Sequence, residues 1–228
     1  MKWAAVIVAA GRGTRLGAPK QFLELAGTPM VGWSIEKFAS MPEIGELVVA
    51  TEPESLDPMR ALCERLASGR AWCVVQGGAT RQRSVYQGLR AVSDKCDAVL
   101  VHDGARPLVT LHDVRAGMHE VRVGRAALLA TPVVDTVKSV ELDSLQVLET
   151  LDRSRLWAAQ TPQFARTAEL RAAHEAARRD GVEATDDAAL LERAGVAVVV
   201  VPSTSENFKV TLPADVDRAD IILSRTVI

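Results

Sequence analysis

Short apolar segments alternate with helical patterns along this chain, and that alternation limits its possible folds more than any other feature. The apolar segments span residues 3–9, 47–51, 72–75, 98–101, 126–130 and 196–201. Most are nearly continuous apolar runs, as expected where both faces of a parallel sheet are covered. The alternation predicts an α/β fold with a doubly wound, mainly parallel sheet. Ligands of such sheets bind beyond the carboxyl ends of the strands, so the loops after the strands are the candidate sites.

The helical patterns between these segments have recognisable ends. They span residues 28–40, 53–68, 80–92, 110–121, 167–181 and 213–226. Thr28 is expected to cap its helix, with Pro29 in the first helical position, and Gly181 is expected to end another. The helix over 213–226 is expected to pack back on the sheet. Residues 160–166 are expected to form a polar interruption near the end of a strand or helix.

Residues 132–157 break the alternation. Two extended runs, 133–140 and 146–151, are joined by the polar turn ELDSL and predict a β-hairpin. An isolated hairpin is only marginally stable in water, so it needs a surface to lie on, and a partner subunit is one candidate. The 228 residues suffice for one large α/β domain or, at a stretch, two small ones, and we expect a single domain over residues 1–228 that includes this hairpin.

The first apolar segment runs into a glycine-rich loop, AAGRGTRLGAPK. Gly11 and Gly13 begin like a dinucleotide-binding fingerprint, but Leu16 replaces its third glycine and no P-loop Gly-Lys-Ser/Thr follows. The glycines admit backbone N–H groups to a ligand, and Arg15 and Lys20 can neutralise phosphate oxygens. A ligand-free turn with solvated cations is the alternative. The crowding of cations at this end of the sheet favours a phosphate ligand.

The loop after residues 98–101 carries the sequence HDGARP. Asp103 would stand at the carboxyl end of the sheet, where a carboxylate can hold a hard divalent cation. Arg106 adds a contact for an anion. The alternative is an ion pair between Asp103 and Arg106 that braces the turn.

Three further stretches leave two interpretations open. Gly78 and Ser84 lie where a helix opens, and exposed backbone groups beside a hydroxyl can read the edge of a base or simply start the helix. Asp186 and Asp187 can merely cap the helix that follows them. Lys209, in the sequence FKV, can face a ligand or solvent.

The net charge and the cysteine content limit which binding partners and which cell compartment we expect for this protein. The chain has 27 basic and 29 acidic residues, a formal net charge of −2, which argues against a basic nucleic-acid-binding face. Any anion must therefore meet a local cluster of cations. Three cysteines without a C-x-x-C pair indicate free thiols in a reducing cytoplasm. The apolar N-terminal run is too short for a signal peptide or a membrane span, so we expect a cytoplasmic protein without membrane or nucleic-acid partners.

The residues alone suggest a small α/β enzyme that handles a nucleoside triphosphate without a P-loop. Cations beside one carboxylate-held metal suit attack at phosphorus, where catalysis rests mainly on positioning and charge stabilisation. A side-chain nucleophile is unnecessary if the attacking group is already a phosphate oxygen.

Six motifs follow one another in a diagnostic order: AAGRGTRLGAPKQF, VHDGARP, PVVDTVK, LDRSRLWAAQTPQF, ATDDAALLE and NFKVT. In this order the chain, from residue 6 to about residue 215, resembles the 2-C-methyl-D-erythritol 4-phosphate cytidylyltransferase family. The resemblance implies a Rossmann-like nucleotidyltransferase domain in which residues 132–157 form a dimerisation arm. It also implies that CTP and 2-C-methyl-D-erythritol 4-phosphate are joined to 4-diphosphocytidyl-2-C-methyl-D-erythritol with release of pyrophosphate. The substrate phosphate would attack the α-phosphorus in line, with Mg²⁺ as cofactor.

The resemblance further implies roles for individual residues. Catalytic roles fall to Arg15, Lys20, Asp103 and Lys209. Asp103 would also sit at the metal. The nucleotide would be held by Ala9, Ala10, Gly11, Gly13, Gly78 and Ser84. The sugar phosphate would be faced by Arg106, Thr185 and, from the arm of the neighbouring subunit in a homodimer, Thr136 and Arg153.

Two alternatives remain beside this interpretation. A sister group that makes CDP-ribitol from ribitol 5-phosphate shares many of the motifs. A nucleotide-binding module without catalysis is the other alternative. The joint presence of four charged residues argues against it: Arg15, Lys20, Asp103 and Lys209.

Ala79 replaces an acidic residue of some relatives, so no side-chain contact with ribose is assigned to it. Arg12 receives no role.

Overall fold

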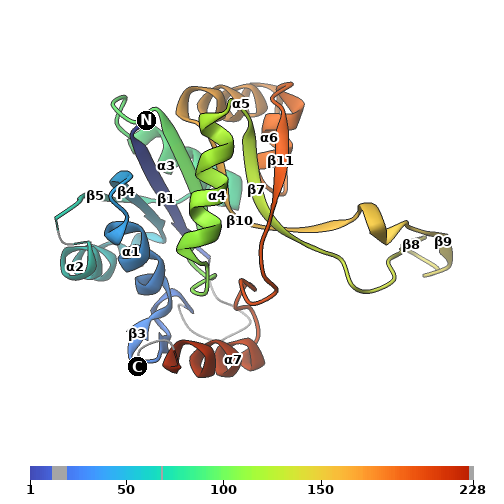
Figure 1. Ribbon diagram of the computed structural model, residues 1–228, viewed down its shortest axis with the longest axis horizontal. Coiled ribbons are helices and arrows are strands. Elements are labelled where there is room, and N and C mark those ends of the chain that lie inside the picture. The colour runs from blue at the N-terminus through green and yellow to red at the C-terminus, as the bar shows by residue number, and fades with distance from the viewer. Residues whose placement is uncertain (12–19, 68, 226–228) are drawn as a thin grey trace.

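The computed structural model describes residues 1–11, 20–67 and 69–225, and its centre is a seven-stranded sheet with the order β11-β7-β10-β6-β1-β4-β5 (Figure 1). The strands of this sheet are β1 (Trp3–Ala9), β4 (Ile44–Thr51), β5 (Ala71–Gln76), β6 (Ala98–Asp103), β7 (Ala126–Pro132), β10 (Trp157–Arg166) and β11 (Val198–Pro202). The helices are α1 (Met30–Ser40), α2 (Leu56–Leu66), α3 (Arg81–Ala91), α4 (Leu111–Arg122), α5 (Thr167–Asp180), α6 (Asp187–Arg193) and α7 (Pro213–Ser224).

Neighbouring strands of the sheet are parallel except where β10 takes part. β10 runs antiparallel to both β6 and β7. From β1 the chain moves outward through β4 to β5 and then returns to β6 on the other side of β1. The strand order therefore reverses between β1 and β6, which is where doubly wound sheets bind their ligands. The mainly parallel sheet expected from the sequence is confirmed.

The six expected strands are all present, but β10 contradicts the interpretation of residues 160–166 as a polar interruption. The side chains of Gln160, Thr161 and Gln163 are buried and hydrogen-bonded rather than turned to solvent. Gln163 accepts a hydrogen bond from the backbone N–H of Ala188 at 2.8 Å and donates one to Asp186 at 2.8 Å. Polar residues can occupy a central strand when each finds a partner in this way.

Two apolar layers enclose the sheet, because successive side chains of a strand point to opposite faces. Along β1, Trp3, Ala5 and Ile7 join the layer that includes residues of α1, α2 and α4. Ala4 and Val6 join the opposite layer with residues of α3, α5 and α6. Burial on both faces explains why β1 is nearly continuously apolar.

Helices α1 and α7 depart from expectation. Thr28 and Pro29 do not begin α1 but form β3 (Thr28–Pro29), which pairs with β2 (Glu24–Leu25), and α1 starts without a side-chain cap. Strand β3 thus occupies the first two residues of the expected helix, and α1 begins at Met30. Helix α7 does not join either sheet layer: Ala219 and Leu223 pack in a separate apolar cluster that includes Leu25.

The expected hairpin stands clear of the sheet as an arm (Figure 1). It contains the antiparallel pair β8 (Lys138–Val140) and β9 (Val147–Thr150), followed by the short helix η3 (Arg153–Arg155). The arm grows directly from the central sheet, because Pro132 at the end of β7 pairs with Trp157 at the start of β10.

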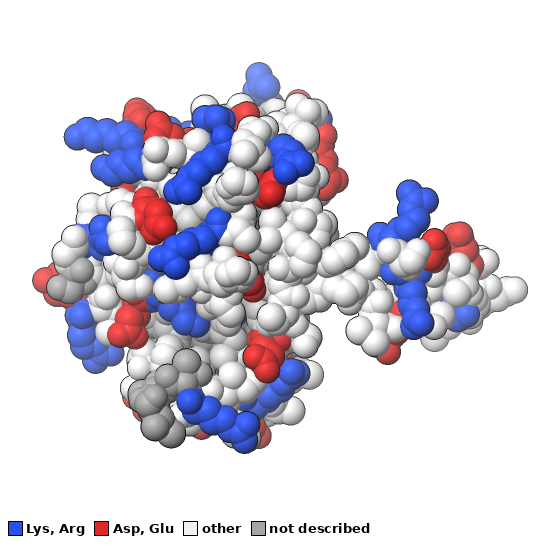
Figure 2. Space-filling view, in the orientation of Figure 1, with Lys and Arg blue, Asp and Glu red and all other residues white. Residues whose placement is uncertain are grey.

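Basic and acidic side chains are interspersed over the face of the body seen in Figure 2. Within residues 1–11, 20–67 and 69–225, none of the helices is both long enough and apolar enough to cross a membrane.

Candidate active site

A cavity of about 730 Å³ opens at the carboxyl ends of β1, β4, β5 and β6. Eight of the residues expected at a nucleotide site line it: Ala9, Ala10, Gly11, Lys20, Gly78, Ser84, Asp103 and Lys209. These residues come from separate segments of the sequence. The reversal of strand order between β1 and β6 brings the segments together.

Backbone contacts between the strand ends close the floor of the cavity. The N–H of Gly104 donates to the carbonyl of Val8 at 2.9 Å, and that of Gly77 donates to Thr51 at 2.8 Å. Gly77 lies so close to the first loop that an added Cβ would come within 2.4 Å of the Cβ of Ala10. Only glycine permits this approach.

Ser84 shapes the wall at Gly78. Its hydroxyl accepts a hydrogen bond from the N–H of Gly78 at 3.1 Å and lies 3.0 Å from the carbonyl oxygen of Thr80, to which it can donate. The side chain is buried. The hydroxyl is thus engaged in holding the turn, and the backbone of Gly78 forms the surface next to the cavity.

Asp103, the last residue of β6, carries the charge at the centre of the site. Arg81 Nε donates to Oδ1 at 2.9 Å, and Lys209 Nζ donates to Oδ2 at 2.8 Å. Burial alone would raise the pKa of Asp103, but Arg81 and Lys209 outweigh it and hold that pKa well below its usual range. The alternative Asp103–Arg106 pair is not formed: Arg106 Nη1 donates to the carbonyl of Asn207 at 2.7 Å. Lys209 is therefore engaged in an ion pair with Asp103, although part of its side chain remains accessible to solvent.

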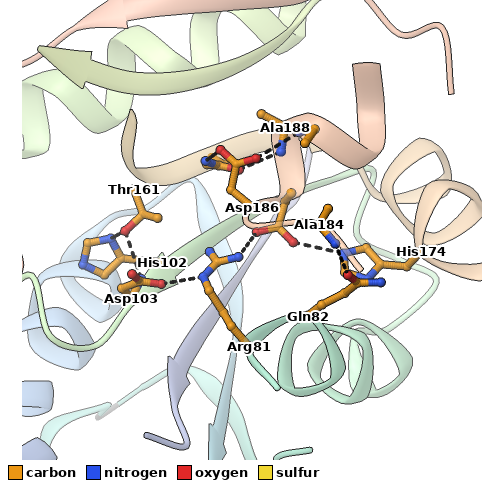
Figure 3. Close-up of polar contacts among 12 residues, drawn as sticks. Arg81, Gln82, His102, Asp103, Thr161, His174, Ala184, Asp186 and Ala188 are labelled. Carbon is orange, nitrogen blue, oxygen red and sulfur yellow. Dashed lines mark hydrogen bonds and ion pairs between the residues drawn. The ribbon is translucent and has the colours of Figure 1, made fainter. Parts of the chain in front are cut away.

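Arg81 joins two carboxylates (Figure 3). Besides Asp103 it binds Asp187, whose Oδ2 accepts from Nη1 at 2.9 Å. The other oxygen of Asp187 lies 3.0 Å from Nε2 of His174. Asp186 is the residue that caps α6, accepting from the N–H of Ala189 at 3.0 Å. The interpretation of Asp187 as a mere cap is therefore wrong.

His102 and Thr161 support Asp103 from the side away from Arg81 (Figure 3). The N–H of Asp103 donates to Oγ1 of Thr161 at 3.0 Å, and that hydroxyl lies 3.2 Å from Nδ1 of His102. Nε2 of His102 lies 3.1 Å from the carbonyl of Arg106, which fixes the Nε2–H tautomer. Complete burial lowers the pKa of His102 to about 3, so the imidazole is neutral in the folded protein.

The segment that carries Lys209 is fastened on both sides. Before it, the buried amide of Asn207 donates to Gln160 at 2.9 Å and to the carbonyl of Thr161 at 3.0 Å. After it, the N–H of Val210 donates to the carbonyl of Ala105 at 2.8 Å. The carbonyl of Val210 in turn accepts from Lys20 Nζ at 3.2 Å. These contacts hold both lysines at the same end of the cavity as Asp103.

The remaining expected residues are not brought together in the same way. Arg106 and Thr185 are not among the described residues that line the cavity. Thr136 and Arg153 lie on the arm, where Arg153 Nη1 donates to the carbonyl of Val134 at 2.6 Å. Gly13 and Arg15, to which the sequence assigns roles, and the unassigned Arg12 lie outside the described residues.

Sequence reasoning assigns no catalytic or binding role to Arg81, Asp187, Thr161 and Asn207. The signal that could have found Arg81 is its place in the first turn of the helix after Gly77 and Gly78. The other three residues act through tertiary hydrogen bonds between segments far apart in the sequence. Local patterns carry no information on such pairings.

Comparison with known proteins bears on both fold and family. A family model described as IspD, 2-C-methyl-D-erythritol 4-phosphate cytidylyltransferase, matches residues 3–225. A protein of that name from Halalkalibacterium halodurans is 39% identical over 226 residues, which cover 98% of each chain.

The crystal structure of the same enzyme from Thermus thermophilus has a TM-score of 0.80 at 35% identity, covering 99% of this chain and 100% of that one. A 4-diphosphocytidyl-2C-methyl-D-erythritol synthase from Anaerococcus prevotii reaches a TM-score of 0.88 at 26% identity, covering 98% and 99%. Both structures confirm the Rossmann-like nucleotidyltransferase fold.

Proposed function

The chain belongs to the 2-C-methyl-D-erythritol 4-phosphate cytidylyltransferase family, and from this membership we propose how its site transfers a cytidylyl group from CTP to 2-C-methyl-D-erythritol 4-phosphate. The products are 4-diphosphocytidyl-2-C-methyl-D-erythritol and pyrophosphate. The observation that carries the proposal is the convergence of Lys20, Lys209 and Asp103 at one end of a cavity of about 730 Å³.

The proposed step is an in-line displacement at the α-phosphorus of CTP. A phosphate oxygen of the second substrate forms the new bond, and the bond from the α-phosphorus to the oxygen bridging it to the β-phosphorus breaks, so pyrophosphate leaves with the bonding electron pair. The attacking phosphate is already anionic at neutral pH, so no side chain has to remove a proton. Catalysis then depends on orientation and on charge stabilisation.

We assign the charge stabilisation to cations at the cavity. Lys20 is fixed at Val210 beside Gly11, and its ammonium can face the reacting phosphate groups. Lys209 is the more exposed cation at Asp103, with 40% of its side chain accessible to solvent. Arg15 is proposed to add a third positive charge on the basis of its motif.

The nucleotide is proposed to bind along the backbone of the two glycine loops. Ala9, Ala10 and Gly11 line one side of the cavity, and Gly78, held by Ser84, lines the other. Gly13 completes the first loop in this proposal. Backbone groups at fixed positions can pair with the polar edge of a base and with phosphate oxygens.

Asp103 fits a Mg²⁺ ion as a hard oxygen ligand. Among the described residues, no group of three or more His, Cys, Asp or Glu side chains could hold a metal. A single carboxylate suits Mg²⁺ nonetheless, because this ion is commonly held by one or two carboxylates together with substrate phosphates. Bound there, Mg²⁺ would neutralise charge on the phosphate groups.

We propose that residues 1–228 form one nucleotidyltransferase domain and that residues 132–157 are its arm in a homodimer. Large apolar side chains exposed on the arm support this, with Val134 79% and Leu142 84% exposed. Such side chains mark an interaction surface. Thr136 and Arg153 would then enter the partner's cavity and, with Arg106 and Thr185, face the sugar phosphate.

A cytoplasmic location is part of the same proposal. Cys63, Cys73 and Cys96 are free thiols, as is usual in a reducing compartment.

Pyrophosphate release from CTP tests the proposed reaction, with each polyol phosphate offered in turn. We expect rapid release with 2-C-methyl-D-erythritol 4-phosphate. Faster turnover with ribitol 5-phosphate would make the chain a ribitol-5-phosphate cytidylyltransferase. CTP binding without release from either substrate would make it a non-catalytic module.

A further inference from the structure

Asp103 is held by two cations that differ in how firmly they are fixed. Arg81 occupies Oδ1 and Lys209 occupies Oδ2. Among the described residues, Arg81 makes two ion pairs and its side chain is 23% exposed, whereas Lys209 makes one and its side chain is 40% exposed. Lys209 is therefore the cation that can leave Asp103 when substrates arrive. Arg81 is the more firmly fixed of the two cations, because it also binds Asp187.

The position of Arg81 is set from its far side by Asp187. Nε and Nη1 of the planar guanidinium bind Asp103 and Asp187 at 2.9 Å each, so two carboxylates fix its orientation. Asp187 is buried and is not among the described residues that line the cavity. Its link to Asp103 runs through Arg81.

Asp187 is itself fixed by its neighbours. Nε2 of His174, on α5, lies 3.0 Å from Oδ1 of Asp187. The start of α6 is anchored to β10, because Gln163 accepts from the N–H of Ala188 and donates to Asp186. In Figure 3, Arg81 lies between Asp103 on one side and His174 on the other. A continuous support thus extends from α5 and β10 to the carboxylate of Asp103.

A set of buried charges such as this one is weak evidence for a stabilising role. Removing ions from water is unfavourable, and apolar residues of similar volume in place of a buried ion pair are often neutral or stabilising. The carboxylate of Asp187, which lies behind the wall of the cavity, has a function if the orientation of the Arg81 guanidinium must be fixed.

We propose that Asp187 is a positioning residue for the transfer reaction, holding Arg81 so that Oδ1 of Asp103 stays occupied and Oδ2 faces the reaction centre. The inference rests on the proposed role of Asp103 in the reaction. Asp187 touches no substrate and acts through Arg81.

The first test compares Asp187→Ala with Asp186→Ala, its neighbour at the same helix start. We expect D187A to lower kcat by about 10- to 100-fold, as for other supporting residues behind a reactive group, with KM for CTP nearly unchanged. D186A removes the cap of α6 and the contact of Asp186 with Gln163, and should lower Tm. The N–H of Ala188 still binds Gln163, so the start of α6 and Arg81 stay in place and kcat should remain near the wild-type value. In D187N one side-chain oxygen remains to accept a hydrogen bond from Arg81, so its kcat should lie between those of D187A and the wild type. A wild-type kcat for D187A, or an equal loss in D186A, would overturn the proposal.

The second test separates positioning from stability. Arg81→Met leaves Asp187 buried without its cation and should lower both Tm and kcat. Adding Asp187→Ala removes that charge, so R81M/D187A should regain Tm while kcat stays low. Recovery of kcat together with Tm would show a purely structural role and overturn the proposal. A wild-type enzyme that releases no pyrophosphate would instead refute the proposed function, and this inference with it.

Discussion

Lys20 stands where three segments of the chain meet. It begins the short helix η1 (Lys20–Phe22), donates to the carbonyl of Val210 and borders Gly11. A positive charge that is already in place need not be reorganised during the reaction, which is why such groups contribute strongly to catalysis.

Replacing Lys20 with alanine should lower kcat by about 10²- to 10³-fold, as for the loss of one preorganised charge-stabilising group. Pyrophosphate release at saturating CTP measures the effect. Lys95→Ala, which removes an exposed lysine outside the cavity lining, is the control and should behave like wild type. A nearly normal kcat for K20A would exclude Lys20 from the mechanism.

His102 should make stability depend on pH. Its pKa is lowered to about 3 in the folded protein, against about 6.5 in an unfolded chain. Between these values the unfolded state binds more protons, so the free energy of unfolding falls as pH decreases, by up to about 1.4 kcal/mol per pH unit.

Urea unfolding at a series of pH values from about 7 down to about 5.5 measures this slope, above the range in which ordinary carboxyl groups titrate. His102→Gln should flatten it. His112→Gln, at an exposed position of α4, should leave it unchanged. Equal slopes for H102Q and wild type would show that His102 does not cause the dependence.

At the scale of elements, α4 packs on β10 through a glycine. A Cβ added to Gly117 would lie 2.2 Å from Cε2 of Phe164, so the helix approaches the ring as closely as a bare backbone allows. Phe164 is completely buried and contacts Trp3 edge to face.

Gly117→Ala should therefore destabilise the protein, although alanine is the better helix former. Overpacking costs about 1–3 kcal/mol, against a propensity gain of at most about 1 kcal/mol. Chemical denaturation measures the net loss in the free energy of unfolding. In the G117A/F164L double variant the smaller side chain should relieve the clash, giving a loss below the sum of the two single losses. Strict additivity would mean that the ring is not the obstacle.

Elements with their own periodicity were predictable, and those defined by distant partners were not. The apolar run of β1 and the pattern of α5, which ends at a glycine, are local signals, and both elements have the expected extent within a residue. β10 was missed because Gln160, Thr161 and Gln163 resemble a loop until their partners are known. For α7, nothing local says which apolar surface it covers.

The same distinction holds for the candidate site. Strand ends and motif order led to Lys20, Asp103 and Lys209, which do line one cavity. Arg81 and Asp187 lie 106 residues apart in the chain and are joined only by the fold. The local sequence around either residue gives no indication of this ion pair.

At the scale of the whole molecule, the role proposed for the arm decides whether one chain alone would contain every residue of the active site. Thr136 and Arg153 belong to residues 132–157, the arm that stands clear of the body in Figure 1. In the proposed dimer, each cavity takes Lys20 from one subunit and Arg153 from the other.

Mixed dimers of K20A and R153A chains test this arrangement. Each single variant should be nearly inactive, but refolding equal amounts together should restore about a quarter of wild-type activity, because half of the dimers are mixed and each has one intact cavity. Mixing K20A with a K20A/R153A chain is the control and should restore nothing. A mixture without activity would place Arg153 in its own subunit's function or remove the arm from the dimer.

Strand β10 begins in the arm at Trp157 and soon afterwards places Thr161 beside Asp103. The pairing of β10 with β7 shifts register between Ala159 and Gln163, so the approach of Thr161 to Asp103 depends on the exact number of residues in this stretch. One residue inserted between Trp157 and Thr161 would displace Thr161 from Asp103 or change the face of the sheet that the following residues meet. The turn at the tip of the arm has no such constraint, because it is exposed and joins two strands that pair with each other. We therefore expect insertions and deletions among related sequences at the tip of the arm and rarely where β10 enters the central sheet. The length of the arm should vary, while its attachment to the sheet should not.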